Sequence, residues 1–226
     1  MSETYLNHYK NLAELFQYPQ EDYKEKVKMA ETILSNHYPE TIPDLKEFSG
    51  FVNKASQEEL EELFSRTFDV QAITTLDIGY VLFGDDYKRG ELLVNLNREH
   101  RQAGNNCGSE LADNLSNILR LLPVMKDIET RNEMIERLIM PALEKIINEF
   151  NVDNVNLKNK IYKKQHKTII DQSEDYGRIY QKPLMVVYSI LEKDFNYIKP
   201  EDERNTNSFT ESIKSEIEID KPFNSL

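Results

Sequence analysis

The chain has 226 residues and carries 40 Asp and Glu against 28 Lys and Arg, a formal net charge of -12. Nucleic acid and anionic membranes would repel such a chain, so neither is expected as a main partner. Only 7 Gly and 8 Pro are present, which disfavours turn-rich sandwiches, barrels and propellers. The single Cys excludes an internal disulfide and suits a reducing compartment. Because the sequence shows neither an apolar run of membrane-span length nor a signal-peptide core, it predicts a soluble, cytoplasmic, helical protein.

Apolar residues at helical spacing predict amphipathic helices through the first third of the chain. The expected helices cover 6–16, 23–34, 42–52 and 60–68. Ser56 and Glu59 form an S-x-x-E capping box, in which each side chain accepts a hydrogen bond from the other residue's backbone N–H. This pair predicts the start of the fourth helix.

The middle of the chain is its least polar part. Residues 73–83 are apolar on most sides and predict the central buried helix. Gly84-Asp85-Asp86 is expected to stop that helix and to cap the next one, which covers 87–103. Gly104 suits the left-handed residue that follows a helix. Asp113 is the expected N-cap of a short helix that ends at Pro123.

A further helical stripe covers 134–150, and Pro141 should kink or split it because proline lacks the backbone N–H. A last stripe between 157 and 169 is expected to complete a helical domain, residues 1–172. Residues 173–226 form an acidic tail that is expected to be largely disordered. An apolar island at 184–191 interrupts this tail and is interpreted as a short helix or strand packed on the domain.

No catalytic or metal-binding pattern stands out. His8, His37, His100 and His166 are scattered without metal-ligand spacing, and each is interpreted as a surface residue. The segment G-D-D-Y-K-R-G at 84–90 lacks the Gly-Lys-Ser/Thr of a phosphate-binding loop, so a turn between helices is favoured. Because no signature places a base beside Cys107, the sequence does not support an enzyme.

The stretch from Phe64 to Leu122 carries short motifs in a recognisable order. T-F-D at 67–69 is followed by F-G-D-D-Y-K-R-G at 83–90, R-Q-A-G at 101–104 and E-L-A-D-N-L at 110–115. This order resembles the NarJ branch of the NarJ/TorD/DmsD family, cytoplasmic chaperones that assemble molybdenum-cofactor oxidoreductases. The segment L-A-E-L-F-Q-Y-P at 12–19 also resembles the family's opening helix. Ala112 and Asn114 depart from the family, which has Pro and His there.

The resemblance implies an all-α fold, a single helical-bundle domain of the NarJ/TorD-like type with an irregular C-terminal tail. It implies a chaperone that binds the N-terminal segment of an apo molybdoenzyme catalytic subunit, a respiratory nitrate reductase or a close relative. The client carries molybdopterin guanine dinucleotide, and the chaperone itself is expected to hold no cofactor or metal stably. A helical peptide needs an apolar groove, and a basic leader is attracted by net negative charge. A generic helical adaptor is the alternative function, and a helical hydrolase is the weakest reading.

Eight residues are the candidates for contact with the client peptide: Phe68, Asp69, Arg89, His100, Arg101, Glu110, Asp113 and Asn114. Glu110 is favoured because it lies in a polar loop and has no evident structural duty. Structural alternatives stay open for the others. Phe68 suits the core, Asp113 suits a helix cap, and Asp69 with Arg89 suits either a buried ion pair or contacts with charged groups of the client.

Overall fold

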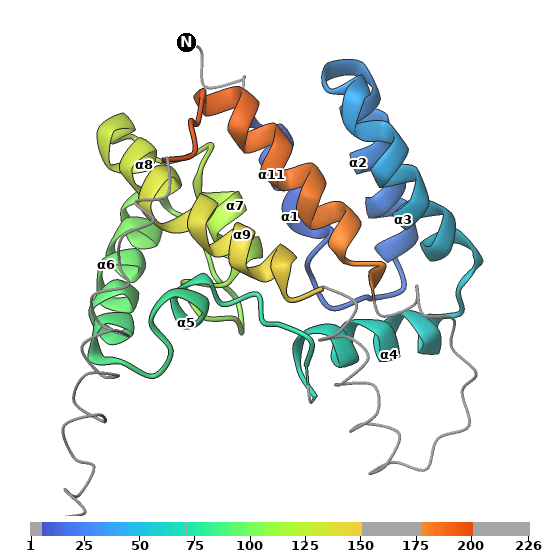
Figure 1. The fold of residues 1–226 in the computed structure, drawn as a ribbon, viewed down its shortest axis with the longest axis horizontal. Helices are drawn as coiled ribbons and strands as arrows, with labels where there is room; N and C mark the ends of the chain where they lie inside the picture. Colours follow the sequence, from blue (N-terminus) through green and yellow to red (C-terminus); the bar gives the residue numbers. More distant parts are fainter. Residues whose placement is uncertain (1–5, 71, 151–177, 201–226) are drawn as a thin grey trace, which may run out of the picture.

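Amphipathic helices make up almost all the regular structure of the computed structural model, which describes residues 6–70, 72–150 and 178–200 (Figure 1). The helices are α1 (His8–Glu14), α2 (Tyr23–His37), α3 (Ile42–Lys54), α4 (Gln57–Phe68), α5 (Ile78–Phe83), α6 (Tyr87–Ala103), α7 (Leu115–Leu121), α8 (Ile128–Met134), α9 (Met140–Asn148) and α11 (Gln181–Phe195). A 3₁₀ turn, η2 (Pro39–Thr41), precedes α3. Within the described ranges there is no β-strand, so the all-α class expected from the sequence is confirmed.

Local signals set several helix ends as expected. At α4 the backbone N of Ser56 donates to Glu59 Oε2 at 2.7 Å, and the backbone N of Glu59 donates to Ser56 Oγ at 3.2 Å. The capping box is therefore confirmed. Asp86 caps α6 by accepting from the backbone N of Lys88 at 2.9 Å. Gly104 ends α6 in the left-handed conformation with φ 67°, which glycine adopts without a Cβ clash.

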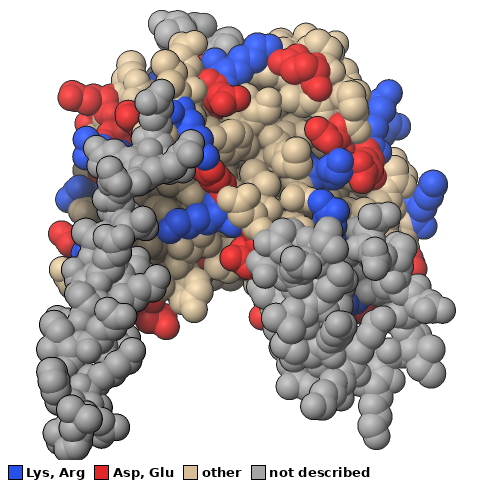
Figure 2. All heavy atoms as spheres, viewed as in Figure 1, with Lys and Arg blue, Asp and Glu red and all other residues tan. Residues whose placement is uncertain are grey.

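The core lies where α1 and α11 meet the other helices. α1 packs against α2 and α7, and α11 packs against α3 and α9, as Figure 1 shows for the orange and yellow helices. Their inward faces hold the largest set of fully buried apolar side chains: Tyr9, Leu12, Phe48, Leu119, Leu143, Ile146, Leu184 and Ile190. On the face seen in Figure 2, acidic and basic side chains are interspersed around this framework.

The apolar segment 73–83 is not the central buried helix that the sequence predicts. Only its second half, α5, is helical, and Tyr80 in that helix is 44% exposed. The first half runs beside the start of α7, where the backbone N of Leu115 donates to the carbonyl of Leu76 at 2.8 Å. Ile73 and Leu76 are buried although they are not helical. An apolar run therefore predicts burial but does not distinguish a helix from a non-helical segment.

The apolar island of the expected tail belongs to the folded domain. It forms α11, a 15-residue helix whose Leu184, Val187 and Leu191 are fully buried. The island is therefore a helix packed on the domain, as one of the two expected forms, and this core helix lies beyond residue 172, where the domain was expected to end. The stripe at 157–169 and the rest of the expected tail lie outside the described residues.

The helical stripe 134–150 is split as predicted. A π-helical turn, η3 (Ile135–Ile139), separates α8 from α9, and Pro141 lies in the first turn of α9. A proline is tolerated there because the first N–H groups of a helix have no intrahelical acceptor.

His8 is not a surface residue. Its Nε2 lies 3.0 Å from Asp194 Oδ2, and that carboxylate also accepts from the hydroxyls of Tyr9 at 2.9 Å and Tyr38 at 2.6 Å. The cluster ties α1 and the end of α2 to α11. Burial opposes ionisation of Asp194, but the hydrogen bonds from His8, Tyr38 and Tyr9 outweigh it and lower its pKa. His8 and Asp194 are far apart in the sequence, so spacing gave no sign of the pair.

Candidate functional site

A hollow of about 670 Å³ opens where the turn after α1, the end of α4, the segment before α5 and the loop before α7 meet. Aromatic rings and carboxylates line it together. The rings are those of Phe16, Tyr18, Phe64 and Phe68, and the carboxylates are those of Asp69, Asp77 and Glu110. Four predicted site residues, Phe68, Asp69, Glu110 and Asn114, therefore share one cavity, and we call it the acidic hollow.

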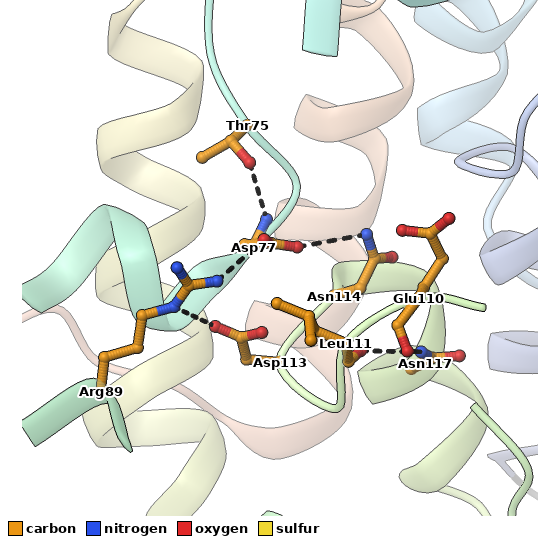
Figure 3. Close-up of polar contacts among 8 residues, drawn as sticks. All are labelled: Thr75, Asp77, Arg89, Glu110, Leu111, Asp113, Asn114 and Asn117. Atoms are coloured by element: carbon orange, nitrogen blue, oxygen red, sulfur yellow. Dashed lines mark hydrogen bonds and ion pairs between the residues drawn. The ribbon is translucent and has the colours of Figure 1, made fainter. Parts of the chain in front are cut away.

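One arginine holds two walls of the acidic hollow together. Arg89 on α6 donates through Nη2 to Asp77 Oδ2 at 2.9 Å and through Nε to Asp113 Oδ2 at 3.1 Å (Figure 3). The backbone N of Ile78 also donates to the carbonyl of Asp113 at 3.0 Å. We call the set Asp77, Arg89 and Asp113 the arginine clamp. It fixes the segment before α5 against the loop before α7.

Gly79 allows this clamp to close. A Cβ at that position would lie 2.6 Å from Asp113 Oδ2 and 3.0 Å from Leu92 Cδ2, closer than packed atoms approach. The helix propensity of alanine would favour Ala at this place in α5. Glycine is needed because the Asp113 carboxylate occupies the space.

The loop before α7 is held by side chains that bond to its backbone. Asn117 donates through Nδ2 to the carbonyls of Leu111 at 2.8 Å and Cys107 at 3.1 Å. Nε2 of His100 lies 3.0 Å from the carbonyl of Ala112. The loop therefore has a fixed path without regular structure. Glu110 is exposed on it, and Figure 3 shows its carboxylate directed away from Asn117.

Asp113 does not cap α7. Its side chain is fully buried in the arginine clamp, and Oδ1 has no hydrogen-bond partner among the described residues. The cap is Asn114, which accepts from the backbone N of Ser116 at 3.1 Å and donates to Asp77 Oδ1 at 3.4 Å. In the E-L-A-D-N-L motif, Asp113 and Asn114 could each cap α7. Asp113 instead binds Arg89 of α6, so Asn114 is the cap.

Asp69 and Arg89 do not form the ion pair that the sequence left open, because Arg89 is bonded to Asp77 and Asp113. Asp69 lines the acidic hollow instead. Desolvation raises the pKa of Asp69, and the charge of Asp77 adds to the effect. Burial likewise raises the pKa of Asp77, and the neighbouring Asp113 reinforces it against Arg89. Three carboxylates, Asp69, Asp77 and Glu110, therefore line the hollow with one guanidinium, that of Arg120, while Arg89 binds Asp77 from outside the lining.

His100 and Arg101 are not part of the acidic hollow. His100 is 1% exposed, which corrects its interpretation as a surface residue, and burial lowers its pKa despite the hydrogen bond to Ala112. It serves the loop as a structural residue. Arg101 is exposed on α6 and does not line the cavity.

Sequence reasoning missed Asp77, Phe16 and Tyr18 as lining residues of the acidic hollow. Tyr18 packs edge-on against Phe64, with ring centroids 5.6 Å apart, and remains 43% exposed. The motif L-A-E-L-F-Q-Y-P carried a signal for Phe16 and Tyr18, because it belongs to the same resemblance as the loop motifs. Asp77 carried none, since the predicted helix placed it inside a buried element.

A second hollow, of about 620 Å³, adjoins the first. The two share Phe68, Asp69 and Thr75, and the second is closed by Tyr80 of α5 and Lys145 of α9. Phe68 and Asp69 therefore lie at the junction of the two hollows.

Metal-ligating groups and the Cys107 thiol were compared with the needs of a metal site and of a nucleophile over the described residues. Within the described ranges there is no group of three or more His, Cys, Asp or Glu that could hold a metal ion. Burial raises the pKa of the Cys107 thiol, so it is less ionised than a free cysteine. No described helix has both the length and the apolar content needed to cross a membrane.

Comparison with known proteins adds no relative. No protein-family model matches the chain, and no curated protein matches it in sequence. The functional proposal therefore rests on the motif order and on the chemistry of the acidic hollow.

Proposed function

We propose that this protein is a cytoplasmic chaperone that binds the N-terminal segment of an apo molybdoenzyme catalytic subunit and supports insertion of its cofactor. The client proposed is a respiratory nitrate reductase or a close relative. The observation that carries the proposal is the acidic hollow. Family-like motifs that lie apart in the sequence, at 67–69 and 110–115, contribute side chains to this one cavity.

The lining of the hollow suits a basic, amphipathic peptide. Tyr18 is 43% exposed and offers apolar surface for the anchors of a helix, which recur at i, i+3 or i+4 and i+7, whereas Phe64 and Phe68 are largely buried beneath it. Asp69, Asp77 and Glu110 offer acceptors for Lys or Arg of the same peptide. Because the carboxylates of Asp69 and Asp77 are destabilised by burial and by like charge, an incoming cation would relieve that cost.

This role requires no catalytic group in the chaperone. The client supplies molybdopterin guanine dinucleotide as its own cofactor, and the chaperone contributes a binding surface. The net charge of -12 favours encounter with a basic leader and raises the association rate more than the final affinity.

Calorimetric titration with synthetic peptides of about 20 residues, copied from the N-termini of molybdoenzyme subunits encoded near this chain, tests the proposal. We expect one of them to bind, and a scrambled peptide of the same composition and charge to bind at least about tenfold more weakly, because anchor spacing is lost. Equal affinity for the scrambled peptide would reduce the interaction to non-specific charge attraction.

A pull-down with the intact protein separates this function from the alternative of a generic adaptor. A dedicated chaperone should enrich one large molybdoenzyme subunit from extracts of cells grown to express such enzymes. Recovery of other proteins without that subunit, together with no heat from any of the peptides, would refute the proposal and favour the adaptor.

A further inference from the structure

Among the described residues that line the acidic hollow, Arg120 is the one with a positively charged side chain. It belongs to the last turn of α7, and its side chain is 25% exposed. The carboxylates of the hollow suit a basic peptide, but Arg120 would repel every Lys or Arg of such a peptide that came near it. Its position in the wall therefore calls for a ligand group of the opposite charge.

Neutral amides, rather than a carboxylate, orient the Arg120 guanidinium. Nη2 donates to Asn117 Oδ1 at 2.8 Å, and Gln17, with its amide oxygen facing Arg120, accepts from Nη2 at 3.1 Å. Nε is buried and has no hydrogen-bond partner among the described residues. Glu14 Oε1 lies 3.9 Å from Nη1, and the other oxygen of that carboxylate lies 3.2 Å from Lys26 Nζ. Arg120 is thus held in place while its charge is only weakly neutralised.

The charge of Arg120 acts on the loop side of the hollow. Burial raises the pKa of the Cys107 thiol, and the positive charge of Arg120 opposes this rise. Within the described residues, no ion pair of 4.0 Å or less joins Arg120 to Glu110 on the same loop. Figure 3 shows the Glu110 carboxylate directed away from Asn117, the residue that Arg120 contacts. This side of the hollow therefore keeps a positive centre beside its exposed carboxylate.

The positive centre is separated from Asp77 along α7. Asn114, the N-cap of α7, donates to Asp77 Oδ1 at 3.4 Å, so Asp77 lies at the start of this helix. Arg120 comes six residues after the cap, about 9 Å along the axis, and its guanidinium reaches back to Asn117, about 4.5 Å from the cap. In Figure 3, Asn114 lies between Asp77 and Asn117. The two charges are therefore separated by about one to two turns of a helix.

We infer that Arg120 binds an acidic side chain of the client peptide, so that the hollow recognises a cation and a carboxylate about one to two helical turns apart. The inference rests on the proposed function, because it names a second group of the same peptide. A carboxylate is the matching ligand, since the planar guanidinium can donate two hydrogen bonds to it. Recognition of both charges also fixes the direction of the peptide. The reversed peptide would place like charges together at Asp77 and at Arg120.

A double-mutant cycle measured by calorimetry tests this contact. The probe is the synthetic N-terminal peptide that binds the wild-type protein, in its original form and in an amide form. In the amide form, each Asp or Glu four or seven residues from a Lys or Arg is changed to Asn or Gln. We expect Arg120→Gln to bind the original peptide about tenfold more weakly than wild type does, and to bind the two forms equally. Arg137→Gln, at a side chain 73% exposed in η3 and outside the hollow, should match wild type.

Arg120→Lys separates the charge from a structural role of the side chain. It keeps the charge but loses the planar fork, so it should still prefer the original peptide, by less than wild type does. An equal loss of affinity for both peptide forms in Arg120→Gln would mean that Arg120 only shapes the loop, and it would overturn the inference while the proposed function stands. Tight binding of a peptide without an acidic residue at these spacings would overturn it in the same way. If no peptide binds wild type, both the proposed function and this inference fail.

Discussion

The α1–α3–α11 core and the walls of the acidic hollow use buried carboxylates in opposite ways. In the core, Asp194 accepts from His8, Tyr9 and Tyr38, and its pKa is lowered. In the hollow, Asp69 and Asp77 are partly desolvated beside each other, and their pKa values are raised. A carboxylate whose ionisation stabilises the fold has a structural duty. Carboxylates whose ionisation costs stability mark a place where the fold is suboptimal, which is typical of binding sites.

The arginine clamp stabilises the fold through ion pairs, and one of its carboxylates, Asp77, also lines the acidic hollow. Breaking the clamp should have the largest effect on stability. Asp113→Asn removes one of the two carboxylates that bind Arg89 and leaves Asp77 as its ionic partner, so it should lower the free energy of unfolding by about 2 kcal/mol. Asp86→Asn is the matched control, because asparagine caps a helix as well as aspartate does and this cap is exposed. Urea denaturation measures both. A loss below about 1 kcal/mol for Asp113→Asn would mean that the clamp is not a structural element.

Gly79 provides a sharper test of the same contact. Gly79→Ala should destabilise the protein by about 1–3 kcal/mol, because its Cβ would meet Asp113 Oδ2 at 2.6 Å. Gly50→Ala, within α3, has open space around the new Cβ and should stabilise by about 0.5–1 kcal/mol through helix propensity. The two changes in melting temperature should have opposite signs. Stabilisation by both would show that α5 can move away from the clamp at little cost.

The pH dependence of stability should distinguish the two kinds of carboxylate. The pKa of Asp194 in the folded state lies below its ordinary value of 3.8, so its contribution is present above about pH 4 and is lost as the pH falls through the folded pKa. The pKa of Asp69 is raised, so its ionisation costs stability as the pH rises above 3.8.

Two neutral variants isolate these contributions. Asp194→Asn should be less stable than wild type at pH 7, and the difference should shrink below about pH 4. Asp69→Asn should be as stable as wild type or slightly more stable at pH 7, with the two curves meeting in acid. Denaturation from pH 3 to 7 measures both. A clear loss of stability in Asp69→Asn at pH 7 would place that carboxylate among the structural groups.

What the sequence could predict follows from how local each interaction is. The caps at Ser56 and Asp86 depend on partners two or three residues away, and both were predicted correctly. The roles of His8, His100 and Asp113 depend on partners from other segments, and each was assigned wrongly. The sequence of α11 was recognised as apolar, but its length and its place in the core were not predicted, because its contacts are to the distant helices α3 and α9.

The candidate site shows the same division. Motif order identifies Phe68, Asp69, Glu110 and Asn114 together as candidates, and all four line one cavity. Asp77 was hidden because its hydrogen-bond partners, Arg89 and Asn114, lie 12 and 37 residues further along the chain. Periodicity describes a helix face but not a wall made of non-helical segments.

The central claim is that the carboxylates of the acidic hollow receive a basic client peptide, and the affinity of that peptide for a Glu110→Gln variant tests it most directly. Glu110 is exposed at the hollow, so its loss should weaken binding about fivefold at low salt without changing the melting temperature. Added salt should reduce the difference. Glu25→Gln, an exposed change on α2 away from the hollow, should leave the affinity at the wild-type value. Equal affinities for wild type, Glu110→Gln and Glu25→Gln at low salt would contradict the claim.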